Sequence, residues 1–187
     1  MNFVKHSELK GLHAFLSAST YHWIRYSDEK LLERYKSHRA KELGTQLHDW
    51  AEQTINLGIK QKDSNQTINM YVNDAIGFRM QTEQILFYSI NCFGTADAIS
   101  FRDNVLRIHD LKTGSTPAHM EQLMIYAALF CLEYKYNPAD IEIHLRIYQN
   151  DDVLCYDPTD EEILFIMGKI VDFDKLITKY QREETGI

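Results

Sequence analysis

The 187-residue sequence has little of what marks secreted, disulfide-bonded or membrane-spanning proteins. Its three cysteines are far apart in the chain and odd in number, which disfavours a disulfide framework and favours a reducing compartment. No apolar run approaches the roughly 20 residues that a membrane-spanning helix needs. The first ten residues lack the basic and then apolar layout of a signal peptide. We therefore expect a cytoplasmic protein without a membrane partner.

Repeats, low-complexity tracts and a recognisable linker are also absent, and the chain has only three prolines. Hydrophobic residues make up 44% of the sequence, which is enough for a sizeable core. A chain of this length is a natural size for one domain. We therefore expect a single domain over residues 1–187.

The net charge of −7 argues at first against a polyanionic partner such as DNA. The charge is uneven, because residues 133–187 hold 13 acidic and 6 basic side chains whereas residues 1–132 are neutral. Within the neutral part, residues 30–41 carry five lysines and arginines against one glutamate. This basic segment is compatible with DNA contact, and a solvated helix face accounts for it equally well.

The pattern of apolar residues predicts alternating helices and strands. We expect helices near residue 20 and over residues 28–57, with a break near Gly44, and then over 69–80, 119–134 and 158–180. Short segments rich in β-branched and aromatic residues predict strands at 84–90, 94–101, 105–111 and 141–148. The turn residues at 102–104 indicate a hairpin between the second and third strands. This order predicts an α/β protein with a central mixed β-sheet flanked by helices.

Two acidic residues and a lysine meet at the end of the predicted hairpin. Asp97 and Asp110 lie in consecutive strands, and Lys112 follows Asp110 by two residues, so the last two side chains would share a face. Carboxylates from adjacent strands suit Mg²⁺ or Mn²⁺, and a neighbouring lysine can orient an attacking water. From this spacing alone an ordinary surface ion pair is favoured, because D-x-K is common by chance.

Five short blocks around these residues occur in a fixed order. They are Leu16-Ser17-Ala18-Ser19, Gly44-Thr45-Gln46-Leu47-His48, Gly94-Thr95-Ala96-Asp97, Asp110-Leu111-Lys112-Thr113-Gly114 and Gln122-Leu123-Met124-Ile125-Tyr126. The last four resemble the G-x-x-x-H, G-x-x-D, D-x-K-T-G and Q-x-x-x-Y motifs of RecB-type nucleases in the PD-(D/E)XK superfamily. The first resembles the serine-containing opening of phage-borne members. Each block by itself is weak evidence for this resemblance, whereas the five blocks in the family's order are strong evidence for it.

The resemblance implies a restriction-endonuclease-like core and a role for each matching residue. The catalytic residues would be Asp97, Asp110 and Lys112. The ligands of Mg²⁺ or Mn²⁺ would be His48, Asp97, Asp110 and the main-chain carbonyl of Leu111. The residues that position substrate would be Gln122, Tyr126, Thr113, Ser17 and Ser19. No iron–sulfur cluster is expected, because the cysteines at 92, 131 and 155 lack the clustered spacing that such a site requires.

Residue type alone is also compatible with a purely structural role at several of these positions. His48 would more often be a structural histidine, Tyr126 a core residue, and the two serines helix caps. Glu52, one turn beyond His48, is a candidate ligand, a support for a ligand, or a solvated side chain. Glu83 stands just before the first predicted strand and could face the cleft, but the sequence does not assign it to the site.

The function implied by the resemblance is a metal-dependent DNA nuclease, a phosphodiesterase of phage exonuclease type that acts in DNA recombination or processing. Its location would be a bacterial or phage-infected cell. The alternatives are an endonuclease with the same site, or a catalytically inactive nuclease-fold protein that binds DNA or serves as a scaffold. Some phage relatives form rings around DNA, so further copies of the chain or a recombination protein are the expected partners. A small-molecule metallohydrolase is disfavoured, because no H-E-x-x-H spacing occurs.

Overall fold

The computed structural model describes residues 4–114 and 116–185. The chain divides into two compact units, Met1–Gln46 and Leu47–Ile187. The expectation of one domain over residues 1–187 stays a prediction. None of the helices in the described residues is both long enough and apolar enough to cross a membrane.

The Met1–Gln46 unit is helical. It holds two 3₁₀ helices, Ser7–Leu9 and Ala18–Arg25, and the first part of helix α1, Asp28–Asn56. The expected break at Gly44 does not occur, because α1 continues through this residue. One glycine inside a helix costs only about 1 kcal/mol relative to alanine, which the hydrogen bonds of the flanking turns can offset.

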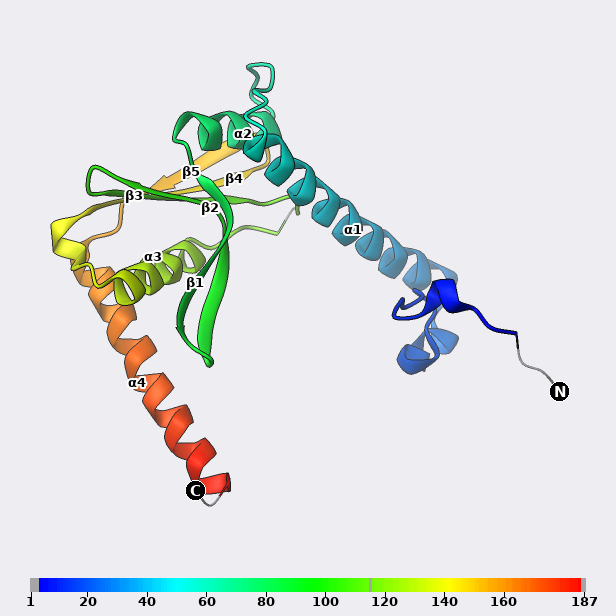
Figure 1. The fold of residues 1–187 in the computed structure, drawn as a ribbon. Helices are drawn as coiled ribbons and strands as arrows, with labels where there is room; N and C mark the ends of the chain where they lie inside the picture. The colour runs from blue at the N-terminus through cyan, green and yellow to red at the C-terminus, as the bar shows by residue number, and fades with distance from the viewer. Residues whose placement is uncertain (1–3, 115, 186–187) are drawn as a thin grey trace. The chain divides into compact units, whose positions relative to one another are not determined.

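The Leu47–Ile187 unit contains a five-stranded mixed sheet with helices against its faces (Figure 1). After α1 its elements are α2 (Thr67–Gly77), β1 (Gln81–Ser89), β2 (Cys92–Arg102), β3 (Val105–Leu111), α3 (Glu121–Tyr134), a 3₁₀ helix (Pro138–Asp140), β4 (Glu142–Gln149), β5 (Asp152–Tyr156) and α4 (Asp160–Thr185). The strands are ordered β1-β2-β3-β4-β5, and only β3 and β4 are parallel. The predicted α/β class with a mixed sheet is confirmed.

The sheet separates two groups of buried side chains. Leu86, Ile108 and Leu145 pack on one face with residues of α3 and α4. Val72 and Tyr148 belong to the other group, which lies against α2 and the last turns of α1. Parallel neighbouring strands need a long crossover connection, and α3 supplies it between β3 and β4.

Strand β5 was not predicted. It is five residues long and mostly exposed. Its sequence, DVLCY, does not alternate between apolar and polar residues, which is the pattern that indicates a half-buried strand. The turn before it is built from Asn150 and Asp151, both with positive φ, which is the geometry of a two-residue hairpin turn. The same geometry occurs at Asp103 and Asn104 between β2 and β3, where the hairpin was predicted.

A buried polar network lies behind β3. The Tyr148 hydroxyl donates to Asp74 Oδ2 at 2.6 Å and lies 3.2 Å from Nδ1 of the fully buried His109. Arg146 donates to the same Asp74 oxygen at 2.8 Å. Burial, together with the charges of Arg146 and Arg107, lowers the pKa of His109 to about 3. His109 is therefore neutral, and Nδ1 must carry its proton because the hydroxyl hydrogen of Tyr148 is used on Asp74.

We predict that Tyr148→Phe lowers the free energy of unfolding by about 1–3 kcal/mol, because it leaves the His109 Nδ1–H buried without an acceptor. Tyr156→Phe is the matched control. Its hydroxyl donates to Glu162 at 2.7 Å on the exposed surface, where water replaces the lost bond. Urea unfolding of both variants measures the difference, and equal losses would contradict the prediction.

Candidate metal centre

Three carboxylates occupy one row across three neighbouring strands. The register of β1 with β2 sets Glu83 opposite Asp97. The register of β2 with β3, continued by one residue, sets Asp97 opposite Asp110. Like charges directly across a sheet repel each other, so this row needs positive charge to balance it.

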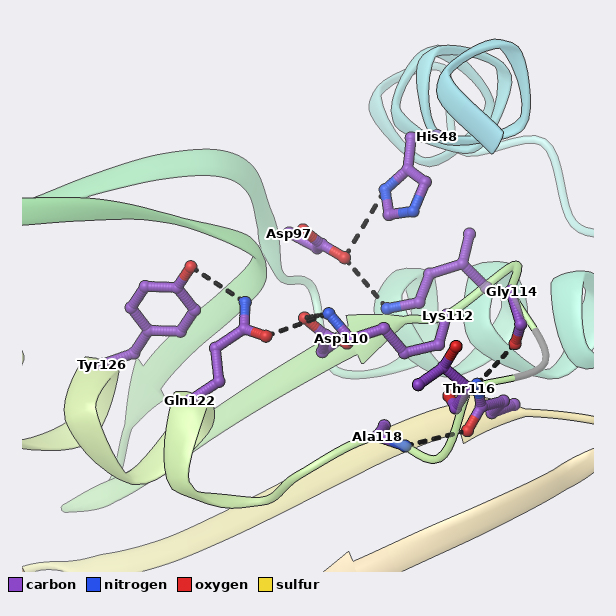
Figure 2. Close-up of polar contacts among 11 residues, drawn as sticks. His48, Asp97, Asp110, Lys112, Gly114, Thr116, Ala118, Gln122 and Tyr126 are labelled. Atoms are coloured by element: carbon purple, nitrogen blue, oxygen red, sulfur yellow. Dashed lines mark hydrogen bonds and ion pairs between the residues drawn. The ribbon is translucent and has the colours of Figure 1, made fainter. Parts of the chain in front are cut away.

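His48 joins this row from helix α1 (Figure 2). Its Nδ1 lies 3.5 Å from Asp97 Oδ2, and the ligand atoms of His48, Glu83 and Asp97 all lie within 4.8 Å of one another. Two ligands on opposite sides of an ion are separated by twice the metal–ligand distance, which is about 4–5 Å for Mg²⁺ or Ca²⁺. The cluster therefore has the dimensions of a shell around a hard divalent cation.

Glu83 reaches the cluster through an irregularity in β1. Its φ of 49° lies in the left-handed region, which costs a side-chain-bearing residue about 1–2 kcal/mol. Thr82 and Leu86 would face the same side of a regular strand, because they are four residues apart. Here the Thr82 hydroxyl donates to Asn56 of α1 whereas Leu86 packs in the core with α3, so the strand changes face between them. Such irregularities re-aim side chains beside functional sites. Sequence reasoning left Glu83 unassigned because the predicted strand began one residue later.

Asp97 lies in an environment that opposes its charge. Burial and the neighbouring charge of Asp110 raise its pKa to about 6. The Leu111 N–H donates to Oδ2 of Asp97 at 2.9 Å, and this bond acts in the opposite direction, as do the charges of His48 and Lys112. A cation at the cluster would remove the remaining penalty, because it stabilises the ionised carboxylate.

Asp110 is paired with Lys112 at the end of β3. Lys112 Nζ lies 3.0 Å from Oδ1 and 2.9 Å from Oδ2 of Asp110. Only the contact with Oδ1 has hydrogen-bond geometry, so Oδ2 is buried without a hydrogen bond among the residues described. A buried carboxylate oxygen that accepts no hydrogen bond has a lone pair available to coordinate a metal ion.

A chain of polar contacts extends from Lys112 to α3 (Figure 2). Gln122 Oε1 accepts from Lys112 at 3.0 Å, and Gln122 Nε2 donates to the Tyr126 hydroxyl at 3.2 Å. The two α3 residues are one turn apart, as their motif spacing implied. Gly94 makes room for this arrangement, since a Cβ there would lie 2.8 Å from Cε1 of Tyr126.

The structure leaves the roles of the remaining candidates as predictions. Glu52 lies close enough to raise the pKa of Glu83, after the larger effect of burial. Thr113 is exposed in the loop after β3. Leu111 contacts Asp97 through its N–H, and its proposed role as a carbonyl ligand is untested. Ser17 and Ser19 belong to the Met1–Gln46 unit, where Ser17 caps a 3₁₀ helix by accepting from the Ser19 N–H.

Comparison of the chain with protein-family models, with curated proteins and with solved structures finds no match. The functional interpretation of the site therefore depends on its geometry and on the resemblance of its motifs.

We predict that Asp97→Asn stabilises the metal-free protein at neutral pH. A carboxyl whose pKa rises from 3.8 to about 6 on folding destabilises the fold once it ionises. The gain should be absent below about pH 4, grow through pH 4–6, and reach about 2–3 kcal/mol above pH 6, at 1.4 kcal/mol per pKa unit. Thermal unfolding with a chelator, from pH 4 to 8, measures it. A less stable variant at pH 8 would show that hydrogen bonding outweighs the charge penalty.

We predict that Gly94→Ala costs about 1–3 kcal/mol of stability, because the new methyl group displaces the Tyr126 ring. In a Tyr126→Leu background the same substitution should cost much less. A double-mutant cycle by urea unfolding isolates this coupling. The same cost in both backgrounds would mean that Gly94 is needed for a reason other than the ring.

Proposed function

We propose that this protein is a divalent-metal-dependent nuclease with a restriction-endonuclease-like core, which hydrolyses phosphodiester bonds of DNA. The observation that carries the proposal is the convergence of His48, the Glu83–Asp97–Asp110 row and Lys112. These groups come from α1 and three strands. A surface ion pair would need neither the imidazole nor the second and third carboxylates.

His48, Glu83 and Asp97 would hold Mg²⁺ or Mn²⁺. Asp110 is not part of this three-residue cluster, and we propose it as a further ligand because it neighbours Asp97 in the row and its Oδ2 makes no hydrogen bond. Histidine nitrogen together with carboxylate oxygen is a donor set that suits Mn²⁺, and carboxylates suit Mg²⁺. When bound, the ion would lower the pKa of a water ligand and offset charge on the phosphate. The left-handed backbone at Glu83 supports a functional role, since strain of this kind concentrates at such sites.

Lys112 is held where it can act on the reacting groups. Its ammonium has three N–H donors, and contacts with Asp110 and Gln122 account for two of them. The third can orient a water or contact a phosphate oxygen. Because Gln122 is itself held by Tyr126, the ammonium is fixed before substrate arrives, which is what positioning requires.

A phage-type exonuclease is the preferred form of this proposal, and an endonuclease with the same site is its alternative. A protein with no turnover, serving as a DNA-binding scaffold, is the competing class. The intact set of His48, Asp97, Asp110 and Lys112 favours catalysis, since a scaffold needs none of these polar groups in contact. The proposed partners are DNA and further copies of the chain or a recombination protein.

Digestion assays test the proposal. Linear and covalently closed circular duplexes are incubated with Mg²⁺, Mn²⁺ or a chelator. We expect metal-dependent loss of linear DNA, with circular DNA spared if the enzyme is an exonuclease and cut if it is an endonuclease. No cleavage with either metal would contradict the nuclease proposal and favour the DNA-binding scaffold without turnover.

Variants separate metal binding from the use of Lys112. Lys112→Ala should lower the cleavage rate at least about 100-fold and leave Mn²⁺ affinity nearly unchanged. Asp97→Ala, Asp110→Ala and Glu83→Gln should each weaken Mn²⁺ binding in titration calorimetry. Lys60→Ala, in an exposed loop, is the matched control for charge and should retain activity. Wild-type cleavage by Lys112→Ala, or unchanged Mn²⁺ affinity in all three acidic variants, would place the site elsewhere.

A further inference from the structure

A second concave site lies in the Leu47–Ile187 unit, lined by residues that take no part in the metal centre. It is a pocket of about 310 Å³ bounded by the start of β1, the end of β2 and the carboxyl end of α3. This volume falls at the lower end of the range of small-ligand sites. Its distinctive lining consists of four aromatic rings and two arginines, which are Phe101, Phe130, Tyr134, Tyr136, Arg79 and Arg102.

The aromatic rings form a continuous wall. Tyr136 lies 4.6 Å from Phe101 and 5.7 Å from Phe130 between ring centroids, and its ring is stacked on that of Phe130 with an angle of 11° between the ring planes. Tyr134 lies 4.9 Å from Phe130. Phe101 and Phe130 pack into the core, whereas Tyr134 and Tyr136 are partly open to solvent, at 49% and 37% exposed. A flat aromatic ligand could stack on such a wall.

The two arginines supply positive charge without an internal counter-ion. Both are exposed, and neither pairs with a carboxylate anywhere in residues 4–114 and 116–185. Arg102 donates to the main-chain carbonyl of Arg79 at 3.4 Å, which joins the two segments that carry them. In a protein of net charge −7, two guanidinium side chains that line one pocket without a carboxylate partner form a local site for an anion.

The backbone conformation at residue 79 does not explain why this residue is an arginine. It follows α2 with φ 52°, at the left-handed position after a helix where glycine is the usual residue. A glycine would save about 1 kcal/mol there. Lys135 has the same geometry after α3, and of these two basic residues only Arg79 lines the pocket.

We propose that this pocket binds a nucleotide, with the base stacked on Tyr134 and Tyr136 and the phosphate held by Arg79 and Arg102. Gln81 and Gln84 also line the pocket, and their amides can donate to and accept from the edge of a base. The nucleotide is either a free mononucleotide or one unit of a nucleic-acid strand. The proposal does not depend on cleavage, because its residues are separate from the metal centre.

Titration calorimetry with a chelator present tests it, so that metal-dependent cleavage plays no part. The probes are 5′-dAMP, deoxyadenosine and inorganic phosphate. We expect 5′-dAMP to bind at least about tenfold more tightly than either fragment. Arg79→Gln and Arg102→Gln should each weaken its binding about tenfold or more, and Tyr136→Leu should weaken binding of both 5′-dAMP and deoxyadenosine. Lys60→Gln is the control for charge and should bind normally.

Two results would overturn the proposal. One is 5′-dAMP binding no more tightly than inorganic phosphate, and the other is unchanged binding by the Arg79→Gln/Arg102→Gln double variant. Circular dichroism of that variant confirms its fold, which we expect to be intact because both side chains are exposed.

A 5′-phosphorylated tetranucleotide distinguishes a free mononucleotide from a nucleic-acid strand as the ligand. If it binds more tightly than 5′-dAMP through the same arginines, the ligand is a strand, and if more weakly, a mononucleotide. Nucleotide binding by a protein that cleaves no DNA would refute the nuclease proposal alone.

Discussion

The close placement of Asp97 and Asp110, with Glu83 beside them, is the constraint on which the site depends. Their strands place the three carboxylates side by side in one row. Asp110 is buried and Asp97 is partly buried, which strengthens the repulsion between these two by removing water, whereas Glu83 is exposed. The pKa of Asp97 is raised to about 6, first by burial and then by the neighbouring charge of Asp110. His48 and Lys112 offset the charge only in part, through their contacts with Asp97 and Asp110. A divalent cation is the group that would balance it.

The fold holds these charges together by linking each to a rigid element. The β2–β3 turn sets the register that brings Asp97 to Asp110, while the Leu111 N–H fixes one Asp97 oxygen. Gln122 fixes the ammonium of Lys112 from α3. Behind β3, the buried and neutral His109 packs against Phe78, which follows α2, and adds no charge. The site is thus organised before any ligand binds, at a cost in stability that is common at functional sites.

Local patterns predicted most of the architecture. Strong helical periodicity and the turn at 102–104 placed the boundaries of α2, α3, β2 and β3 within a few residues. The placement of Asp97 across from Asp110 followed from that hairpin, because register along two strands is fixed by the turn that joins them. Strand β5 was missed since its exposed residues carry no alternation, and pairing with β4 is what makes it a strand.

The sequence by itself determined the α/β class, the hairpin with its two aspartates, and the proximity of Lys112 to Asp110. These depend on neighbours a few residues apart, for which spacing is informative. Only the tertiary structure decided that Glu83 joins His48 and Asp97, and that Arg79 and Arg102 share a pocket with Tyr136. Both results depend on left-handed backbone at a single residue and on the packing of distant elements, and neither leaves a periodic signal in the sequence.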